Sequence, residues 1–292
     1  MTGLVLKGIG GFYYVLGADG NTHTLRAQSK IRHERLKPLV GDRVEFMPGD
    51  YEADGWLIRI LERKNFFIRP PIANVDILVI TLSASAPQAD LMLCDRLLLF
   101  ARKKSIRAFI AVTKLDEDAV NAHNISDEYK ASGADVFAVS AHTGEGVQAL
   151  RNALRGSTHA FAGQSGAGKS TLINSLYGLK LDTGDISNRI MRGKHTTRAC
   201  SLIPVEDGGA VMDTPGFSLL ESEMLIPEQI AELYGEFSPF KDSCRFSPCT
   251  HINEPDCAVK RALAEGAISS GRYERYKLLF SEMNERWKKR YD

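Results

Sequence analysis

The stretch AFAGQSGAGKST, residues 160–171, contains the motif G-x4-G-K-[ST] in full. An apolar run precedes the motif and a helix-forming run follows it, which is the context of a phosphate-binding loop. Glycines let backbone N–H groups curl around the α- and β-phosphates, and the positive end of the following helix points at them. The lysine should reach the β- and γ-phosphates, and the serine hydroxyl should bind Mg²⁺. We therefore predict that a nucleotide is bound by Gly163, Gln164, Ser165, Gly166, Ala167, Gly168, Lys169, Ser170 and Thr171.

The base of the nucleotide is expected to contact TKLD, residues 113–116, which directly follows the apolar run AFIAV. A carboxylate at Asp116 can accept from guanine N1–H and N2–H₂, whereas adenine offers neither donor and would leave the carboxylate unpaired. The stem of Lys114 can lie along the base, and Thr113 completes the motif. Taken alone, K-x-D after a strand is equally the pattern of a surface turn.

Ser140 and Ala141 give the base motif independent support. They follow the apolar run VFAV, and a small loop of this kind can offer a backbone N–H to guanine O6. Both base elements stand at the carboxyl ends of predicted strands, where open α/β sheets bind ligands. The ligand predicted from the three elements together is GTP or GDP rather than ATP.

Asp213-Thr214-Pro215-Gly216 supplies a D-x-x-G element after another apolar run. Asp213 would hold the Mg²⁺ shell and the Gly216 N–H would sense the γ-phosphate. A switch threonine is expected in RGKHTTRAC, residues 192–200, where Thr196 and Thr197 are both open and Thr197 is favoured. The predicted Mg²⁺ ligands are Ser170, Thr197 and Asp213.

The order of these elements is unusual, because the base motifs precede the phosphate loop and the switches come last. This is the ordinary GTPase series cut and rejoined, which is a circular permutation. The permutation places the switch segments directly before the C-terminal part of the chain. We expect it to leave the sheet and the nucleotide site intact.

The 292 residues are enough for two or three domains. Short alternating runs punctuated by Gly, Asp and Asn predict an all-β barrel of the OB type at 1–68. Alternating strand and helix patterns predict a central α/β P-loop GTPase domain, circularly permuted and with a mostly parallel sheet, at 69–221. The pattern then turns helical, which predicts a helical zinc-binding domain at 222–292.

The zinc prediction rests on three of the five cysteines, which crowd into a short loop with one histidine. Three thiolates and an imidazole suit tetrahedral Zn²⁺, and four protein ligands leave no open position for catalysis. The predicted site is therefore structural, and the alternative is three unrelated reduced thiols. The predicted ligands are Cys244, Cys249, His251 and Cys257.

Composition and charge bound the other possibilities. The net charge of +1 excludes a polycation, although basic residues gather in 23–37 and 272–290, which could meet RNA or be solvated faces. No apolar run approaches the about 20 residues of a membrane span, and the N-terminus lacks the layout of a signal peptide. We expect a cytoplasmic protein without a membrane partner, and nothing demands more than a monomer.

The set TKLD, VSA, GQSGAGKST, KHTTR, DTPGF and the Cys/His knot, in this order, resembles the bacterial circularly permuted GTPases that depend on the small ribosomal subunit (RsgA type). The resemblance covers essentially the whole chain. It implies a GTP hydrolase that binds 16S ribosomal RNA, acts late in maturation of the small (30S) subunit and is stimulated by that subunit. Thr113 replaces the asparagine usual in GTPases generally.

Another group should be needed to orient the attacking water. Many GTPases use a glutamine just after D-x-x-G, but that position is Phe217 in this chain, and phenylalanine cannot hydrogen-bond water. His195 in the switch segment is the candidate water-positioning group, a role that the resemblance also implies, and a histidine of a mobile loop is the alternative. The predicted catalytic residues are His195, Lys169 and Thr197.

Two other functions stay open at the level of sequence. A GTP-gated regulatory protein acting on another protein would use the same nucleotide site, with hydrolysis incidental. A P-loop phosphotransferase would need an acceptor pocket and a base, for which the sequence offers no motif. Salt dependence separates the first from an RNA-binding GTPase, because RNA binding weakens steeply as ionic strength rises.

Overall fold

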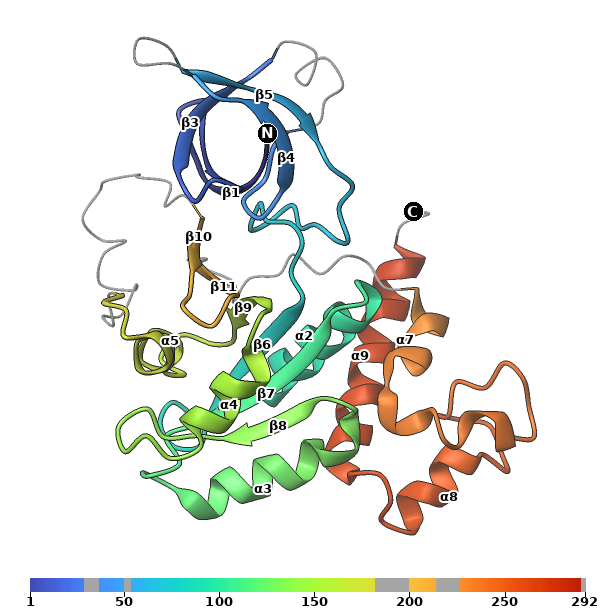
Figure 1. The fold of residues 1–292 in the computed structure, drawn as a ribbon. Helices are drawn as coiled ribbons and strands as arrows, with labels where there is room; N and C mark the ends of the chain where they lie inside the picture. Colours follow the sequence, from blue (N-terminus) through green and yellow to red (C-terminus); the bar gives the residue numbers. More distant parts are fainter. Residues whose placement is uncertain (29–36, 50–53, 182–199, 214–225, 290–292) are drawn as a thin grey trace. The chain divides into compact units, whose positions relative to one another are not determined.

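The computed structural model describes residues 1–28, 37–49, 54–181, 200–213 and 226–289. The described chain divides into two compact units. The divisions fall within strand β6 (Ile77–Ser83), helix α4 (Val147–Leu154) and strand β9 (Thr158–Ala162), which are labelled in Figure 1. The first unit comprises 1–78, 152–161 and the described part of 185–220. The second comprises 79–151, 162–184 and the described part of 221–292. The predicted domain limits at 68 and 221 stay a prediction.

A five-stranded barrel forms the first part of unit one. Its strands are β1 (Thr2–Ile9), β2 (Phe12–Gly17), β3 (Thr22–Ala27), β4 (Arg43–Met47) and β5 (Gly55–Ile60). They pair in the order β2-β3-β5-β4-β1, and pairing of β1 with β2 closes the ring. Alternate side chains point inward, so the barrel is filled by Val5, Val15, Leu25, Val44, Phe46 and Leu57.

The remaining strands of unit one are a hairpin that pairs with the barrel and one strand that pairs with the hairpin. They are β9 (Thr158–Ala162), β10 (Ser201–Pro204) and β11 (Ala210–Asp213). β1 pairs with β10 through Lys7 and Ser201, β10 pairs antiparallel with β11, and β11 runs parallel to β9. Backbone hydrogen bonds therefore join the hairpin that ends at Asp213 to the barrel.

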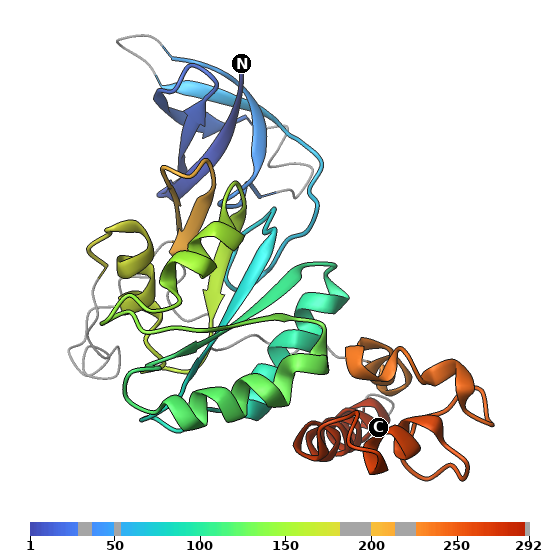
Figure 2. The ribbon, with the colours of Figure 1, turned by 60° about the horizontal axis from the view of Figure 1, so that its bottom comes forward.

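Unit two contains the parallel strands that carry the base motifs. β6 (Ile77–Ser83), which begins in unit one, is buried along its whole length, as expected of a strand covered on both faces. β7 (Arg107–Thr113) pairs in parallel with β8 (Asp135–Ala138). Helices α2 and α3 lie along one face of these strands and α4 along the other (Figure 2). The helices are α2 (Leu91–Lys103), α3 (Ala119–Tyr129), α4 (Val147–Leu154) and α5 (Lys169–Tyr177), with the short turn η1 (Lys130–Ser132) after α3.

The C-terminal segment of unit two is helical. It comprises α7 (Pro227–Leu233), η2 (Gly235–Phe237), η3 (Lys241–Ser243), α8 (Ala258–Ala264) and α9 (Ser270–Lys288). Its core is rich in aromatic rings, including Tyr234, Phe237, Tyr273 and Tyr276, and Leu99 of α2 belongs to the same core. Within the described residues, no helix combines the length and the apolar character that crossing a bilayer requires.

Candidate functional site

The phosphate loop leads from β9 into α5, as the motif predicts. Gly163 has φ 137°, and a Cβ at this position would lie 2.4 Å from the carbonyl oxygen of Thr81, so only glycine fits. Gly168 has φ 81° and caps the N-terminus of α5. The glycines are therefore required by the backbone of the loop, which leaves its N–H groups available at a helix N-terminus.

The Lys169 ammonium folds back over its own loop. Nζ donates hydrogen bonds to the carbonyl oxygens of Gly163 (2.8 Å) and Gln164 (2.6 Å). Burial lowers the pKa of Lys169 to about 8. A phosphate oxygen is a better partner for a buried ammonium than a carbonyl, so a bound nucleotide can replace these two acceptors.

Thr113 connects the base motif to the phosphate loop. Its hydroxyl is buried, within hydrogen-bond distance of the carbonyl oxygens of Ala167 (2.8 Å) and Leu82 (3.1 Å). The end of β7 and the phosphate loop are thus in direct contact in unit two. The hydroxyl of Thr113 thus bonds to the protein backbone, and its predicted contact with the nucleotide stays a prediction.

The two base elements also meet each other. The buried Ser140 hydroxyl donates to the Asp116 carboxylate and accepts from the Thr143 N–H at 3.0 Å. The pKa of Asp116 is lowered, first by the Ser140 hydrogen bond and also by the imidazole of His142, whose Nδ1 lies 3.7 Å from the carboxylate. Asp116 is therefore held ionised, in the state that accepts guanine N–H donors.

The segment 84–90, between β6 and α2, belongs to the site but was not predicted from the sequence. Lys114 donates through Nζ to the Ala86 carbonyl, and the Gln164 side chain bonds to the backbone of Gln88 and Asp90. The segment thereby contacts both the base motif and the phosphate loop. The sequence feature that could have identified this segment is its position, because it follows the carboxyl end of a buried parallel strand, where ligands of α/β sheets bind.

Of the remaining residues predicted to bind the nucleotide or Mg²⁺, some belong to the described residues and some do not. Asp213 is the last residue of β11, and Met212 pairs with Ala160 of β9, so both strands end at the same edge of the sheet. Ser170 lies in the first turn of α5 and is partly exposed. The other residues predicted in the switches lie outside the described residues: His195, Thr196, Thr197, Gly216 and Phe217.

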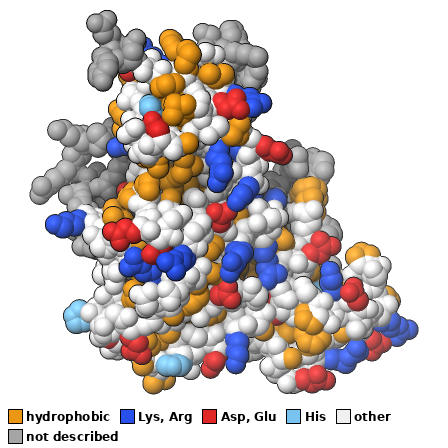
Figure 3. Space-filling view, in the orientation of Figure 1, with side chains coloured by type: hydrophobic (Ala, Val, Ile, Leu, Met, Phe, Trp, Pro, Cys, Tyr) orange, Lys and Arg blue, Asp and Glu red, His pale blue; other side chains and the backbone are white. Residues whose placement is uncertain are grey.

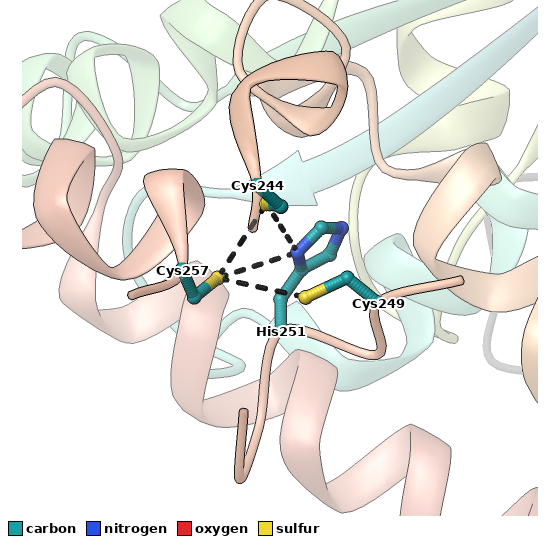
Figure 4. A group of neighbouring side chains, drawn as sticks. All are labelled: Cys244, Cys249, His251 and Cys257. Atoms are coloured by element: carbon teal, nitrogen blue, oxygen red, sulfur yellow. Dashed lines mark hydrogen bonds between the residues drawn. The ribbon is translucent and has the colours of Figure 1, made fainter. Parts of the chain in front are cut away.

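The three cysteines and the histidine of the C-terminal segment come together as predicted (Figure 4). Their ligand atoms all lie within 4.8 Å of one another. The sulfur of Cys257 is 3.9 Å from the sulfurs of Cys244 and Cys249, and His251 Nδ1 is 3.6 Å from Cys244 and 3.4 Å from Cys257. Tetrahedral Zn²⁺ requires edges of about 3.8 Å between sulfurs and about 3.6 Å between sulfur and nitrogen. The residues therefore fit a tetrahedral metal ion.

The backbone around Cys244 favours its thiolate. Burial raises the pKa of Cys244, but hydrogen bonds from the backbone N–H groups of Ala258 and Val259 and from the neighbouring thiols lower it by more in total, so the pKa is lowered overall. Burial raises the pKa of Cys249 to about 12. Tyr273 on α9 donates from its hydroxyl to the carbonyl oxygen of His251 at 2.7 Å. The Glu254 carboxylate accepts from the Thr250 N–H at 2.7 Å, which closes the turn around the histidine.

Known proteins resemble this chain over nearly its whole length. The family described as RsgA GTPase matches residues 60–223, and the RsgA N-terminal domain matches residues 2–57. The chain is 40% identical to the small ribosomal subunit biogenesis GTPase RsgA of Caldanaerobacter subterraneus subsp. tengcongensis, over 99% of this chain and 98% of that protein. It is 42% identical to the protein of the same name from Geobacillus sp. (strain WCH70), over 97% and 98%.

Two solved structures are similar to the fold. YjeQ from Thermotoga maritima superposes with a TM-score of 0.84 at 32% identity, covering 97% of this chain and 98% of that one. YloQ, described as a circularly permuted GTPase, superposes with a TM-score of 0.80 at 33% identity, covering 98% and 95%. The predicted fold class, a barrel followed by a circularly permuted GTPase domain and a C-terminal Cys/His segment, is confirmed.

Proposed function

We propose, because this chain belongs to the RsgA GTPase family, that it binds GTP, hydrolyses it to GDP and acts in late maturation of the small ribosomal subunit. One observation carries the nucleotide part of the proposal. Thr113 of the base motif bonds to Ala167 of the phosphate loop, so two segments 54 residues apart form one site. The ribosomal part rests on the names of the relatives.

The nucleotide contacts follow from the site. Backbone N–H groups of 163–171 surround the phosphates, and Lys169 moves from its loop carbonyls to the β- and γ-phosphates. Asp116 accepts the two guanine donors while Ser140 fixes its carboxylate. Lys114 and Ala141 complete the base site, the first along the ring and the second towards O6.

The proposed Mg²⁺ ligands are Ser170, Thr197 and Asp213. Hydroxyl and carboxylate oxygens are the donors that this cation prefers, and two of the three lie at the carboxyl edge of the sheet or the start of α5. Bound Mg²⁺ neutralises the phosphate charge during transfer. His195 is proposed to orient the attacking water, because Phe217 cannot, and Gly216 is proposed to sense the γ-phosphate.

The metal proposed for the Cys/His cluster is Zn²⁺ in a structural role. Cys244, Cys249, His251 and Cys257 would fill all four tetrahedral positions, which leaves none for a substrate. When bound, the ion links α8 to the preceding loop. An RNA-binding role for the C-terminal segment would therefore depend on the metal only through folding.

Ribosomal RNA is the proposed partner of the barrel. Across four strands, Phe12 pairs with Arg26, Arg26 with Trp56, and Trp56 with Met47, and the last three are exposed. The Arg26 guanidinium lies 4.6 Å from the centre of the Phe12 ring. Hydrophobic side chains also reach the surface of the barrel on the face drawn in Figure 3. Aromatic and arginine side chains at a barrel surface are suited to stacking unpaired bases.

GTP turnover with and without purified small subunits tests the proposal. We expect slow hydrolysis by the protein alone, faster hydrolysis with small subunits, no change with large subunits and no competition by ATP. His195→Ala should lower the stimulated kcat much more than the affinity for GTP. Turnover unaffected by small subunits would remove the ribosomal role, and effective competition by ATP would remove the base assignment.

We further propose that the protein works as a cytoplasmic monomer.

A further inference from the structure

Helix α2 is attached at its start to the phosphate loop. The Gln164 side chain accepts the Asp90 N–H at Oε1 (2.5 Å) and donates from Nε2 to the Gln88 carbonyl at 2.8 Å. Asp90 is the N-cap of α2, and its carboxylate accepts from the Leu93 N–H. Both hydrogen-bonding groups of one loop side chain are therefore used to hold the beginning of the helix.

The same helix is attached along one side to the C-terminal segment. Met92, Asp95, Arg96 and Leu99 follow the spacing of a single helix face, and each contacts that segment. Asp95 is fully buried and accepts from Arg272 Nη1, from Arg275 Nε at 2.7 Å and from the Tyr129 hydroxyl at 2.7 Å. A buried carboxylate with this many donors fixes its partners tightly.

Helix α9 then reaches the Cys/His cluster. Arg272 forks onto the Glu236 carboxylate at 2.7 and 3.0 Å, and the neighbouring Tyr273 bonds to the backbone of His251. Asp90 and Asp95 are five residues apart, which is about 7.5 Å along a helix. A short, rigid and fully bonded path therefore runs from the phosphate loop through α2 and α9 to the metal cluster.

We propose that Gln164 is a positioning residue, through which the phosphate loop and the C-terminal segment stabilise each other by way of α2. The inference rests on nucleotide binding at the phosphate loop, as proposed above. The loop must hold several N–H groups in a convergent array, and a loop ordered before binding loses less entropy on binding. Coupling is reciprocal, so loosening the contact between α2 and α9 must weaken nucleotide binding.

A cycle of two substitutions tests the coupling, with the affinity for a fluorescent GDP analogue as the measurement. Gln164→Ala should weaken binding about tenfold, because it removes two hydrogen bonds that order the loop. Arg275→Met, more than a hundred residues away in the sequence, should weaken binding about fivefold. The double variant should lose about tenfold, since the second change has no route to the loop once Gln164 is gone.

Gln88→Ala is the matched control, because alanine retains the backbone carbonyl that accepts from Gln164, and its affinity should equal that of the parent. If Arg275→Met does not fold by circular dichroism, Glu282→Gln replaces it, since this change weakens only the partly exposed ion pairs of Glu282 with Arg96 and with Arg286. Losses that multiply in the double variant, or an unchanged affinity in Arg275→Met, would overturn the inference. A parent protein that does not bind GDP would instead refute the proposed function.

Discussion

The phosphate loop and the Cys/His cluster lie in the same unit, yet their polar groups are satisfied in opposite ways. In the loop, protein groups already satisfy one another: Lys169 bonds to two loop carbonyls and Gln164 bonds to the start of α2. In the cluster, three sulfurs and one ring nitrogen face each other at metal-ligand spacing. The first site can form without its ligand and exchange it, whereas the second needs a cation to hold thiolates together.

Metal removal should therefore have the largest effect, and we expect that effect in the C-terminal segment that holds the cluster. A structural Zn²⁺ contributes about 10 kcal/mol or more to the folding of a small metal-dependent segment. We expect one equivalent of zinc in the purified protein, and Cys257→Ala should lose both the metal and the helical signal of α8 and α9. Zinc analysis and circular dichroism check this. Cys94→Ala, at a buried cysteine outside the cluster, should keep one equivalent; a full helical signal in Cys257→Ala would contradict a structural metal.

The second largest effect is expected from the buried ion pairs that join α2 to the C-terminal segment. Arg272→Met removes the arginine from the buried Glu236 carboxylate and leaves Asp95 with Arg275 alone, which should lower the free energy of unfolding by about 3–5 kcal/mol. Arg107→Met removes an ion pair with Asp135 whose side chains are 67% and 61% exposed, and it should change stability by less than about 1 kcal/mol. Urea denaturation of both variants makes the comparison. Equal losses would show that the buried network contributes no more than a surface pair.

The smallest expected effect is the pH dependence of the phosphate loop. Burial lowers the pKa of Lys169 to about 8 in the free protein, and phosphates favour its charged form, so nucleotide binding takes up a proton above that pH. The affinity for GDP should fall about tenfold between pH 7 and pH 9. Stability without nucleotide should change in the other direction, because above pH 8 the unfolded chain holds more protons on this lysine than the folded one.

Equilibrium titration of a fluorescent GDP analogue across this pH range measures the effect. Lys169→Arg retains its charge throughout and should show a flat profile, whatever its absolute affinity. A flat profile for the parent as well would mean that Lys169 does not titrate in the free loop.

The contiguous motifs could be found in the sequence because the residues of each lie close together in the chain and their types follow from one chemical requirement. The glycines of 163–168 follow from backbone angles, and Asp116 follows from the donors of guanine. The Cys/His ligands lie within fourteen residues, so their spacing alone indicated a metal. The order of the motifs indicated the permutation and the alternating runs indicated the barrel, whereas the ribosomal role came from the resemblance to a family.

The basic C-terminal helix shows where such reasoning fails. Residues 272–290 read as a charged surface that could meet RNA, but Arg272 is 3% exposed and belongs to the buried network around Asp95. Its partner lies 177 residues earlier in the chain. Charge counts along a sequence do not reveal which charges are neutralised inside, since that depends on partners brought by distant segments.

The sequence by itself indicated the chemistry of this protein: a loop of the phosphate-binding pattern, a carboxylate suited to guanine and a set of side chains suited to a metal ion. Each is encoded by residue types at short, fixed spacing, which the local backbone converts directly into geometry. Only the tertiary structure decided how those sites are supported, with Thr113 on the phosphate loop, Gln164 on α2 and Asp95 between the arginines of α9. These contacts join segments that the chain keeps far apart, and their existence depends on packing that no local pattern contains.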